Sequence, residues 1–501
     1  VCILLLRPIS PARIGNSTTF GREVFVTSAA TQPAKPHQNA DSGTVTQGGG
    51  GEGASIGKGK LISFFLAFIA LIVVLLIPID SIEWQGQIAL GMLAFAVIMW
   101  VTEAVSYPVS SVLIIGLIAM LVGLSPDPEN PGEIFGTGPA LSIALGGFSS
   151  GAVALVAAAL ALATAMQATG LHRRIALNVL KVAGEKTSHI VAGAIVISII
   201  LAFFVPSATA RAGAVVPILL GMVAAFGMTV DSKLSALLVI TAVQAVSIWN
   251  VGIKTAAAQN LVAIGFIEDQ MGQTVSWGKW FLWAAPWAVL MSIALYFIML
   301  AVMKPEVDHI EGGRELVQQQ LDEMGPMTGA EKRLTAIAVV LLLFWATEGL
   351  LHPINSSTIT LVAIGVMLLP GIGVMDFKYA QNHINWGTLI VFAVGISLGS
   401  FLLKTGAATW LSEQTFGALG ISSMPILATI AIVSLFNIII HLGFASATSL
   451  ASALIPVFIA LAATLDVPNG GIGFVIIQQF VICFGLSLIH ISEPTRRRGI
   501  S

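Results

Sequence analysis

The chain carries one pattern of residues twice, and this duplication constrains its fold more than any other feature. The first set of landmarks recurs 245 positions later: Trp100, Thr102, Glu103, Pro108 and Ser111 return as Trp345, Thr347, Glu348, Pro353 and Ser356. Two further sets recur after 236 and 239 positions: Thr169-Gly170 as Thr405-Gly406, and Ser207-Ala208-Thr209 with Pro217 as Ser446-Ala447-Thr448 with Pro456. Because order and spacing persist over half the chain, the sequence predicts two structural repeats of one unit.

The composition indicates whether these repeats lie in water or in a lipid bilayer. Hydrophobic residues make up 56% of the chain and charged residues only 10%, with a mean hydropathy of +0.93, whereas soluble domains carry about 25% charged residues. The chain is therefore predicted to be an integral multi-pass membrane protein. Repeats in such a protein are typical of a transporter whose substrate site lies where the halves meet. An intramembrane enzyme is disfavoured, since no Ser/His, paired-Asp or metal-binding constellation appears at membrane depth.

The apolar runs predict an all-α fold. Those long enough to cross a bilayer are 61–79, 87–105, 109–124, 143–169, 235–265, 281–302, 335–351, 357–374, 386–403 and 424–440, and two more, 189–226 and 441–463, contain a polar Ser-Ala-Thr. The predicted divisions are a disordered or targeting segment at 1–57, a first transmembrane helix with repeat 1 at 58–302, a cytoplasmic-side linker at 303–333, repeat 2 at 334–486 and a tail at 487–501.

The charges of the loops predict that the repeats are inverted. Basic residues gather in two loops, as His172, Arg173, Arg174, Lys181 and Lys186, and as Lys304, Arg314, Lys332 and Arg333, whereas 80–86 and 125–138 contain only acids. By the positive-inside rule the basic loops face the cytoplasm or its equivalent. Glu103 then lies at an inner helix end and Glu348 at an outer one. We expect both glutamates to cap helix ends or bind backbone rather than to carry protons.

The two Ser-Ala-Thr segments predict the binding site. Residues 206–213 interrupt an apolar stretch too long for one crossing, and irregular backbone at membrane depth requires burial or a wet cavity. We expect a re-entrant hairpin with Ser207 to Thr209 at its tip and a half-helix beginning just after it. The N-terminus of a half-helix carries partial positive charge that suits a carboxylate. Ser446 to Thr448 would form the same tip from the opposite face, and two tips meeting at the midplane suit a dicarboxylate.

These residues resemble the divalent anion:sodium symporter superfamily of dicarboxylate and tricarboxylate carriers. The likeness covers about 61–486 and includes Gly147-Phe148-Ser149-Ser150, Thr169-Gly170-Leu171-His172-Arg173-Arg174 and Leu321-Asp322-Glu323-Met324-Gly325-Pro326-Met327. The last stretch and the first tip are most similar to the exchanger branch, which includes plastid 2-oxoglutarate/malate translocators and bacterial citrate or tartrate antiporters. The resemblance implies a homodimer in a plastid inner envelope or bacterial inner membrane. It also implies substrates of the 2-oxoglutarate, malate, succinate and citrate class.

The tips depart from the family pattern in a way that favours exchange. In sodium-coupled members an Asn in each Ser-Asn-Thr helps to form a sodium site, and both positions are alanine here, Ala208 and Ala447. A cation stands beside each tip instead, Arg211 and His441. An intramembrane ionisable group is costly and is usually functional, and a fixed charge in place of a bound ion would make the empty carrier reluctant to reorient. We predict an antiporter without cofactor or metal; the alternative is a sodium-coupled dicarboxylate symporter.

Residues 247–260 fall where the family has a broken helix that completes the first site, and Asn250, Gly252, Thr255 and Asn260 fit an unwound, hydrogen-bonding stretch. The predicted substrate-binding residues are Ser207, Ala208, Thr209, Arg211, Asn250, Thr255, His441, Ser446, Ala447 and Thr448. Structural alternatives exist for several of them. The hydroxyl groups can bond back to the preceding helical turn, Arg211 can be a structural anchor, and His441 can be a core residue. Lys254 is either a second substrate cation or a side chain that snorkels to an interface.

Both ends of the sequence are atypical. The first Met is Met92, and residues 1–57 are rich in Ser, Thr, Gly and Ala, which is compatible with a transit peptide. Residues 487–498 break the apolar pattern and look like translated sequencing-adaptor read-through. On that interpretation a last family helix and the partner of the broken helix are missing.

Overall fold

The computed structural model of the chain describes residues 57–205, 207–421, 424–444, 446–465 and 467–484, and these are helical without a β-strand. The first-half α-helices are α1 Lys58–Leu76, α2 Trp84–Thr102, α3 Tyr107–Gly123, α4 Thr137–Leu145, α5 Gly151–Thr169, α6 Leu171–Ala183, α7 Thr187–Phe204, α8 Ala208–Ala225, α9 Lys233–Gly252, α10 Ala258–Met271 and α11 Trp277–Val302. There follow α12 Gly313–Met324, α13 Gly329–Thr347, α14 Ser356–Leu368, α15 Phe377–His383, α16 Trp386–Lys404, α17 Ala407–Phe416, α18 Ile426–His441, α19 Ala447–Thr464 and α20 Ile472–Cys483. The all-α prediction is confirmed. The predicted segments 1–57 and 487–501 lie outside the described residues, apart from Gly57.

The predicted repeat is present in the local structure of the two halves. Helices α2 and α13 both have 19 residues and end at the paired threonines. The Oγ1 atoms of Thr102 and Thr347 each donate to the carbonyl four residues earlier, at 2.7 Å in both halves. Helices α8 and α19 both have 18 residues, with Pro217 and Pro456 at the same internal position. One sequence pattern has therefore produced one local structure twice.

A second paired landmark, Thr-Gly, forms the same corner in each half. Thr169 and Thr405 bond back to the preceding turn with their hydroxyls, and the following Gly170 and Gly406 both have φ of 72°. This left-handed conformation is readily available to glycine because glycine has no Cβ. The corner separates α5 from α6 and α16 from α17, so these pairs of helices occupy equivalent places.

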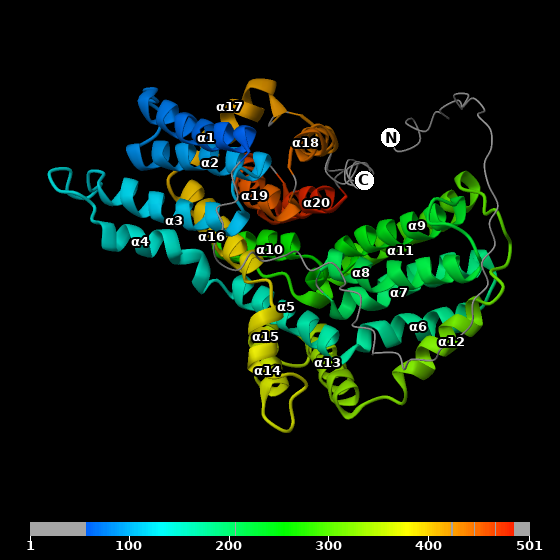
Figure 1. Cartoon of the computed structure of the whole chain (residues 1–501). Coiled ribbons are helices and arrows are strands. Elements are labelled where there is room, and N and C mark those ends of the chain that lie inside the picture. The colour runs from blue at the N-terminus through cyan, green and yellow to red at the C-terminus, as the bar shows by residue number, and fades with distance from the viewer. Residues whose placement is uncertain (1–56, 206, 422–423, 445, 466, 485–501) are drawn as a thin grey trace, which may run out of the picture. The chain divides into compact units, whose positions relative to one another are not determined.

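Elements of the two halves pack against one another (Figure 1). Helix α16 of the second half contacts α3 and α4 of the first, while α5 of the first contacts α14 of the second. Helix α10 lies against α16 and α19. Within each half, α9 packs on α7 and α8 as α20 packs on α18 and α19. The inverted orientation of the halves stays a prediction.

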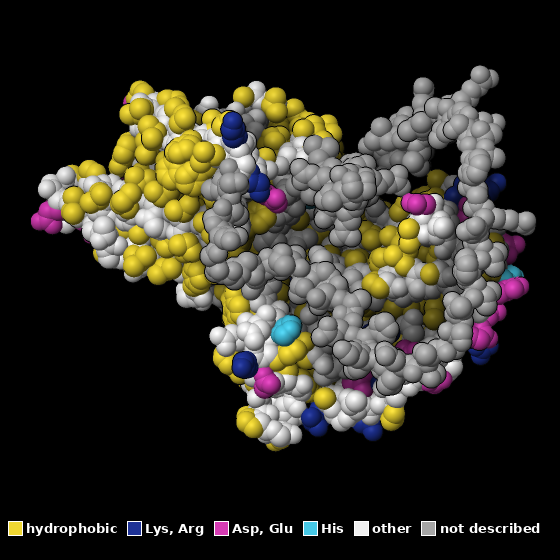
Figure 2. Space-filling model, in the orientation of Figure 1, with side chains coloured by type: hydrophobic (Ala, Val, Ile, Leu, Met, Phe, Trp, Pro, Cys, Tyr) yellow, Lys and Arg dark blue, Asp and Glu magenta, His cyan; other side chains and the backbone are white. Residues whose placement is uncertain are grey.

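Apolar surface confirms a membrane protein. Eight of the described helices are long and apolar enough to span a bilayer. Only Ala67 and Leu71 of α1 are buried, whereas Ile62 is 67% and Leu76 is 76% exposed. Hydrophobic side chains dominate the surface over α1 and α2 in Figure 2. Such a surface is stable against lipid and not against water.

Three sequence expectations need correction. The run 143–169 is not one helix, because a 3₁₀ turn, η2 at Gly146–Ser149, separates α4 from α5. There the backbone of Gly147 approaches α16 and donates to Ser397 Oγ at 2.9 Å, and a Cβ at Gly147 would lie 2.1 Å from a carbonyl oxygen of α16. The first basic loop, 171–187, is largely the amphipathic helix α6. The linker 303–333 contains α12, and α13 already begins at Gly329.

An ion pair joins the predicted linker, residues 303–333, to α6. Arg174 of α6 bonds Glu331 of α13 at 2.6 Å and also donates to the carbonyl of Gly325 at 2.9 Å. Glu331 and Thr328 form a capping box. The backbone amide of Glu331 donates to Thr328 Oγ1, and the backbone amide of Thr328 donates to the carboxylate of Glu331. The start of the second half is thereby tied to a helix of the first.

Candidate functional site

The first Ser-Ala-Thr segment begins a helix, as predicted. Helix α7 ends at Phe204 and α8 begins at Ala208, with Ser207 as the N-cap residue whose hydroxyl accepts from the Ala210 amide at 3.2 Å. Ala208 and Thr209 therefore belong to the first turn of α8 and do not precede it. The helix–turn–helix is confirmed, whereas its re-entrant depth in a membrane stays a prediction.

The second segment repeats this geometry. Ser446 caps α19 by accepting from the Ser449 amide at 3.3 Å, and Ala447 and Thr448 form the first turn. His441 is the last residue of α18 and is 4% exposed. A cationic side chain at this end of a helix would interact favourably with the helix dipole. Whether the two tips meet stays a prediction.

Beside the first tip, the chain breaks a helix in two. Helix α9 ends at Gly252, a short 3₁₀ turn η3 spans Lys254–Ala256, and α10 begins at Ala258. Ile253 and Ala257 are extended on either side of η3. The break leaves backbone carbonyls without helical partners, and such groups need other donors when they are buried.

Arg211 supplies one of these donors and contacts two other predicted site residues, Ser207 and Asn250. Its guanidinium is fully buried, and Nη2 donates to Asn250 Oδ1 and, at 3.0 Å, to the carbonyl of Ala256. Nε reaches the carbonyl of Ser207 at 3.5 Å. Arg211 thus joins the hairpin tip to the helix break through oxygens that carry no net charge. Among the described residues, its Nη1 has no hydrogen-bond partner and Arg211 forms no ion pair with an acid.

Lys254 is a second buried cation at the break. Its side chain is 4% exposed, and Nζ donates to the carbonyl of Val275 at 2.7 Å. The ammonium group is therefore buried within the protein, and the choice between substrate cation and snorkelling side chain stays a prediction. Two buried cations therefore meet the helix break: Lys254 lies in η3, and Arg211 reaches it from α8.

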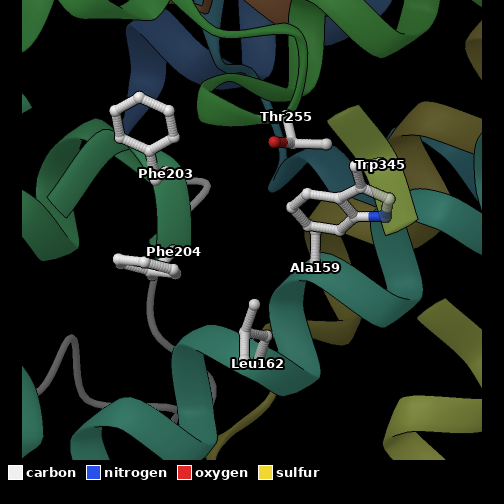
Figure 3. Close-up of a pocket in the computed structure, with 6 residues that line it drawn as sticks. All are labelled: Ala159, Leu162, Phe203, Phe204, Thr255 and Trp345. Carbon is white, nitrogen blue, oxygen red and sulfur yellow. The ribbon is translucent and has the colours of Figure 1, made fainter. Parts of the chain in front are cut away.

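Thr255 faces a narrow aromatic pocket (Figure 3). The pocket is lined by Ala159, Leu162, Phe203, Phe204, Thr255 and Trp345. The two phenylalanines lie at the end of α7, opposite Trp345 and Thr255. Thr255 Oγ1 accepts from Trp277 Nε1 at 3.3 Å, and Trp277 stacks on Trp345. These aromatic residues are not among the predicted site residues, although Trp345 is a landmark of the repeat.

Comparisons with known proteins agree with this architecture. The family described as "Sodium:sulfate symporter transmembrane region" matches residues 58–496. The chain belongs to this family. A "Membrane protein" of Cupriavidus necator is 48% identical over 86% of this chain and 84% of its own length.

Two relatives with functional names are more distant. The "L-tartrate/succinate antiporter" of Escherichia coli K12 is 29% identical, covering 79% of this chain and 82% of its own length. The "Sodium-dependent dicarboxylate transporter SdcS" of Staphylococcus aureus NCTC 8325 is 26% identical, covering 74% of this chain and 72% of its own length. The predicted resemblance to divalent anion:sodium symporters is confirmed. This family member is an integral membrane transporter and not an enzyme.

Proposed function

We propose that the protein is an exchanger of di- or tricarboxylates that works by alternating access. The observation that carries this proposal is the environment of Arg211, a buried guanidinium held by neutral oxygens, with one donor nitrogen that no described residue accepts from. A buried charge without a counter-ion is unfavourable, and a charge-assisted hydrogen bond to a carboxylate compensates it. The substrate is the missing anion.

The charge of the site supports a substrate with more than one carboxylate. Arg211 of α8 contacts the helix break and Lys254 lies within it; both donate to neutral oxygens, and the carboxylates of Glu268 and Glu348 are close enough to interact with the charge of Lys254. The second tip adds His441 and the N-terminus of α19. A dianion complements this arrangement, and the amides at both helix starts can contribute hydrogen bonds.

Exchange is favoured over sodium-coupled symport by the chemistry of the two tips. Ala208 and Ala447 offer no side-chain oxygen to a sodium ion. At the first tip, Arg211 already bonds the carbonyl of Ser207, the side-chain oxygen of Asn250 and the carbonyl of Ala256. These are the hard oxygen ligands that a cation would use. The Escherichia coli relative is named an antiporter, whereas the Staphylococcus aureus relative, named sodium-dependent, keeps symport as the second candidate.

Reconstitution into proteoliposomes tests the proposal. Uptake of labelled succinate, malate or 2-oxoglutarate should require unlabelled dicarboxylate inside the vesicles and should not respond to a sodium gradient. Empty vesicles and vesicles loaded with a monocarboxylate serve as controls. Uptake into empty vesicles that rises steeply with external sodium would establish the symporter instead.

A further inference from the structure

A buried network of amide groups joins the helix break of the first half to helix α20 of the second. Its centre is Asn260, in the first turn of α10 and fully buried. Asn260 Nδ2 donates to the carbonyls of Asn250 at 2.7 Å and Ile253 at 3.2 Å. Asn260 Oδ1 accepts from Gln479 Nε2 at 3.2 Å and from the Cys483 thiol at 3.1 Å.

This side chain makes every hydrogen bond that an amide can make. A carboxamide has two donor hydrogens and two acceptor lone pairs, and Asn260 uses all four with four different residues. The pattern also fixes its orientation, because exchanging oxygen and nitrogen would place an NH₂ group against the Gln479 NH₂ group and oxygen against two carbonyls. A fully satisfied buried amide is rigid, so the break has one preferred geometry.

The network reaches the anion site on its first-half side. Asn260 holds the backbone carbonyl of Asn250, and the side chain of the same Asn250 accepts from Arg211. It also holds Ile253, which precedes the turn containing Ala256, the second acceptor of Arg211 Nη2. Asn260 therefore braces the backbone that carries both acceptors of Nη2.

On its second-half side the network reaches the other hairpin. Helix α20, which carries Gln479 and Cys483, packs on both α18 and α19. Asn437 of α18 donates to the carbonyl of Gln478 at 3.0 Å, directly before Gln479. The chain of contacts thus runs from Arg211 to the helix that ends at His441.

We propose that Asn260 is a positioning residue for the anion site and that it conveys the state of the second half to Arg211. This inference rests on the proposed function, because Arg211 is taken as the group that meets the substrate. Asn260 itself need not touch the anion. Gln479 acts through Asn260, because Nε2 of Gln479 bonds the oxygen of this amide and not the break itself.

The test combines transport with hydrogen exchange in the full chain. Gln479→Leu removes one hydrogen bond to Asn260 and should raise the apparent KM for dicarboxylate about tenfold, the size of effect expected when one buried hydrogen-bond partner is lost. Asn260→Ala removes all four bonds and should raise it at least as much. The double variant should resemble Asn260→Ala alone, since Gln479 acts through Asn260. Gln479→Leu should also speed amide exchange at residues 253–257, which lie in the other half.

Gln87 offers a matched control for these variants. It is a buried amide of α2 that donates to the carbonyls of Val74, Leu75 and Ile77 at the end of α1. Gln87→Ala should lower the melting temperature while leaving KM per folded molecule and exchange at 253–257 unchanged.

The outcomes separate this inference from the proposed function. An unchanged KM in Asn260→Ala, additive effects in the double variant, or unaltered exchange at 253–257 in Gln479→Leu would overturn the inference while wild-type transport persists. If the wild type exchanges no dicarboxylate, the proposed function fails. The amide hydrogen-exchange data at residues 253–257 alone then decide whether α20 fixes the geometry of the helix break.

Discussion

Replacement of Arg211 tests whether the buried guanidinium binds the transported anion. In Arg211→Ala the substrate loses a charge-assisted bond in a water-excluded site, which is worth about 2–5 kcal/mol for close buried pairs. At about 3 kcal/mol the apparent affinity falls roughly 150-fold, so exchange should be abolished at ordinary substrate concentrations. Arg211→Lys retains the charge but not the planar fork. It should impair exchange less severely, by about tenfold.

The same substitution also affects folding, and the two effects must be separated. Removing the guanidinium leaves the oxygen of Asn250 and the carbonyl of Ala256 without this donor, at a cost of about 1–3 kcal/mol for each unsatisfied group. We therefore expect less folded protein in addition to lower activity. The deciding quantity is the exchange rate per folded molecule, with folded protein quantified by size-exclusion chromatography.

Arg174→Ala is the matched control for Arg211→Ala. Arg174 bonds Glu331 and two backbone carbonyls, of Met324 and Gly325, and so loses comparable contacts away from the site. It should reduce the yield of folded protein and leave the specific rate normal. A normal specific rate in Arg211→Ala as well would show that Arg211 is only a structural anchor.

Two further predictions concern topology and pH. Cysteines placed at Val182 and Leu351, which are 87% and 81% exposed, should react with an impermeant maleimide from opposite sides of the membrane, and labelling from one side would mean parallel repeats. Burial of Glu331 opposes its ionisation, but hydrogen bonds from Arg174 and Thr328 outweigh burial and hold its pKa below the ordinary 4.5. The carboxylate therefore stabilises the fold at neutral pH, and this contribution is lost as pH falls below about 4.5 through the folded-state pKa. Glu331→Gln should melt lower at pH 7 but show a weaker decline under acid, and an unchanged decline would contradict this assignment.

Features that depend on a local sequence pattern could be predicted from the sequence. The paired Ser-Ala-Thr segments identified both helix starts, because a serine N-cap is a local signal. The interpretation of Glu348 is confirmed: it is the C-cap residue after α13 and accepts from the amide and hydroxyl of Ser356 at the start of α14. Glu103 is the C-cap residue after α2 and accepts from the Tyr107 hydroxyl at 3.1 Å. Both glutamates thus lie at helix ends, although their partners differ.

Features that depend on contacts between distant segments could not be predicted. The break after Leu145 arises where Gly147 meets α16, some 250 residues away, and nothing in the apolar run 143–169 marks that meeting. The partners of Asn260 in α20 lie 219 and 223 residues further along the chain. The aromatic wall around Thr255 likewise combines residues from α7, α11 and α13. Each depends on tertiary packing, which periodicity does not encode.

If the protein is an exchanger as proposed, the cations of the site give a physical reason for obligatory exchange. Without substrate, Arg211 remains charged and buried, since a guanidinium does not lose its proton under ordinary conditions. Moving an uncompensated cation across the low-dielectric core costs several kcal/mol, and about 3 kcal/mol slows reorientation of the empty carrier roughly 150-fold. A bound dicarboxylate removes most of this barrier, whichever dicarboxylate it is. We therefore expect slow net uptake and fast counterflow, whereas a sodium-coupled carrier needs a cation that can leave, and the guanidinium of Arg211 is covalently fixed.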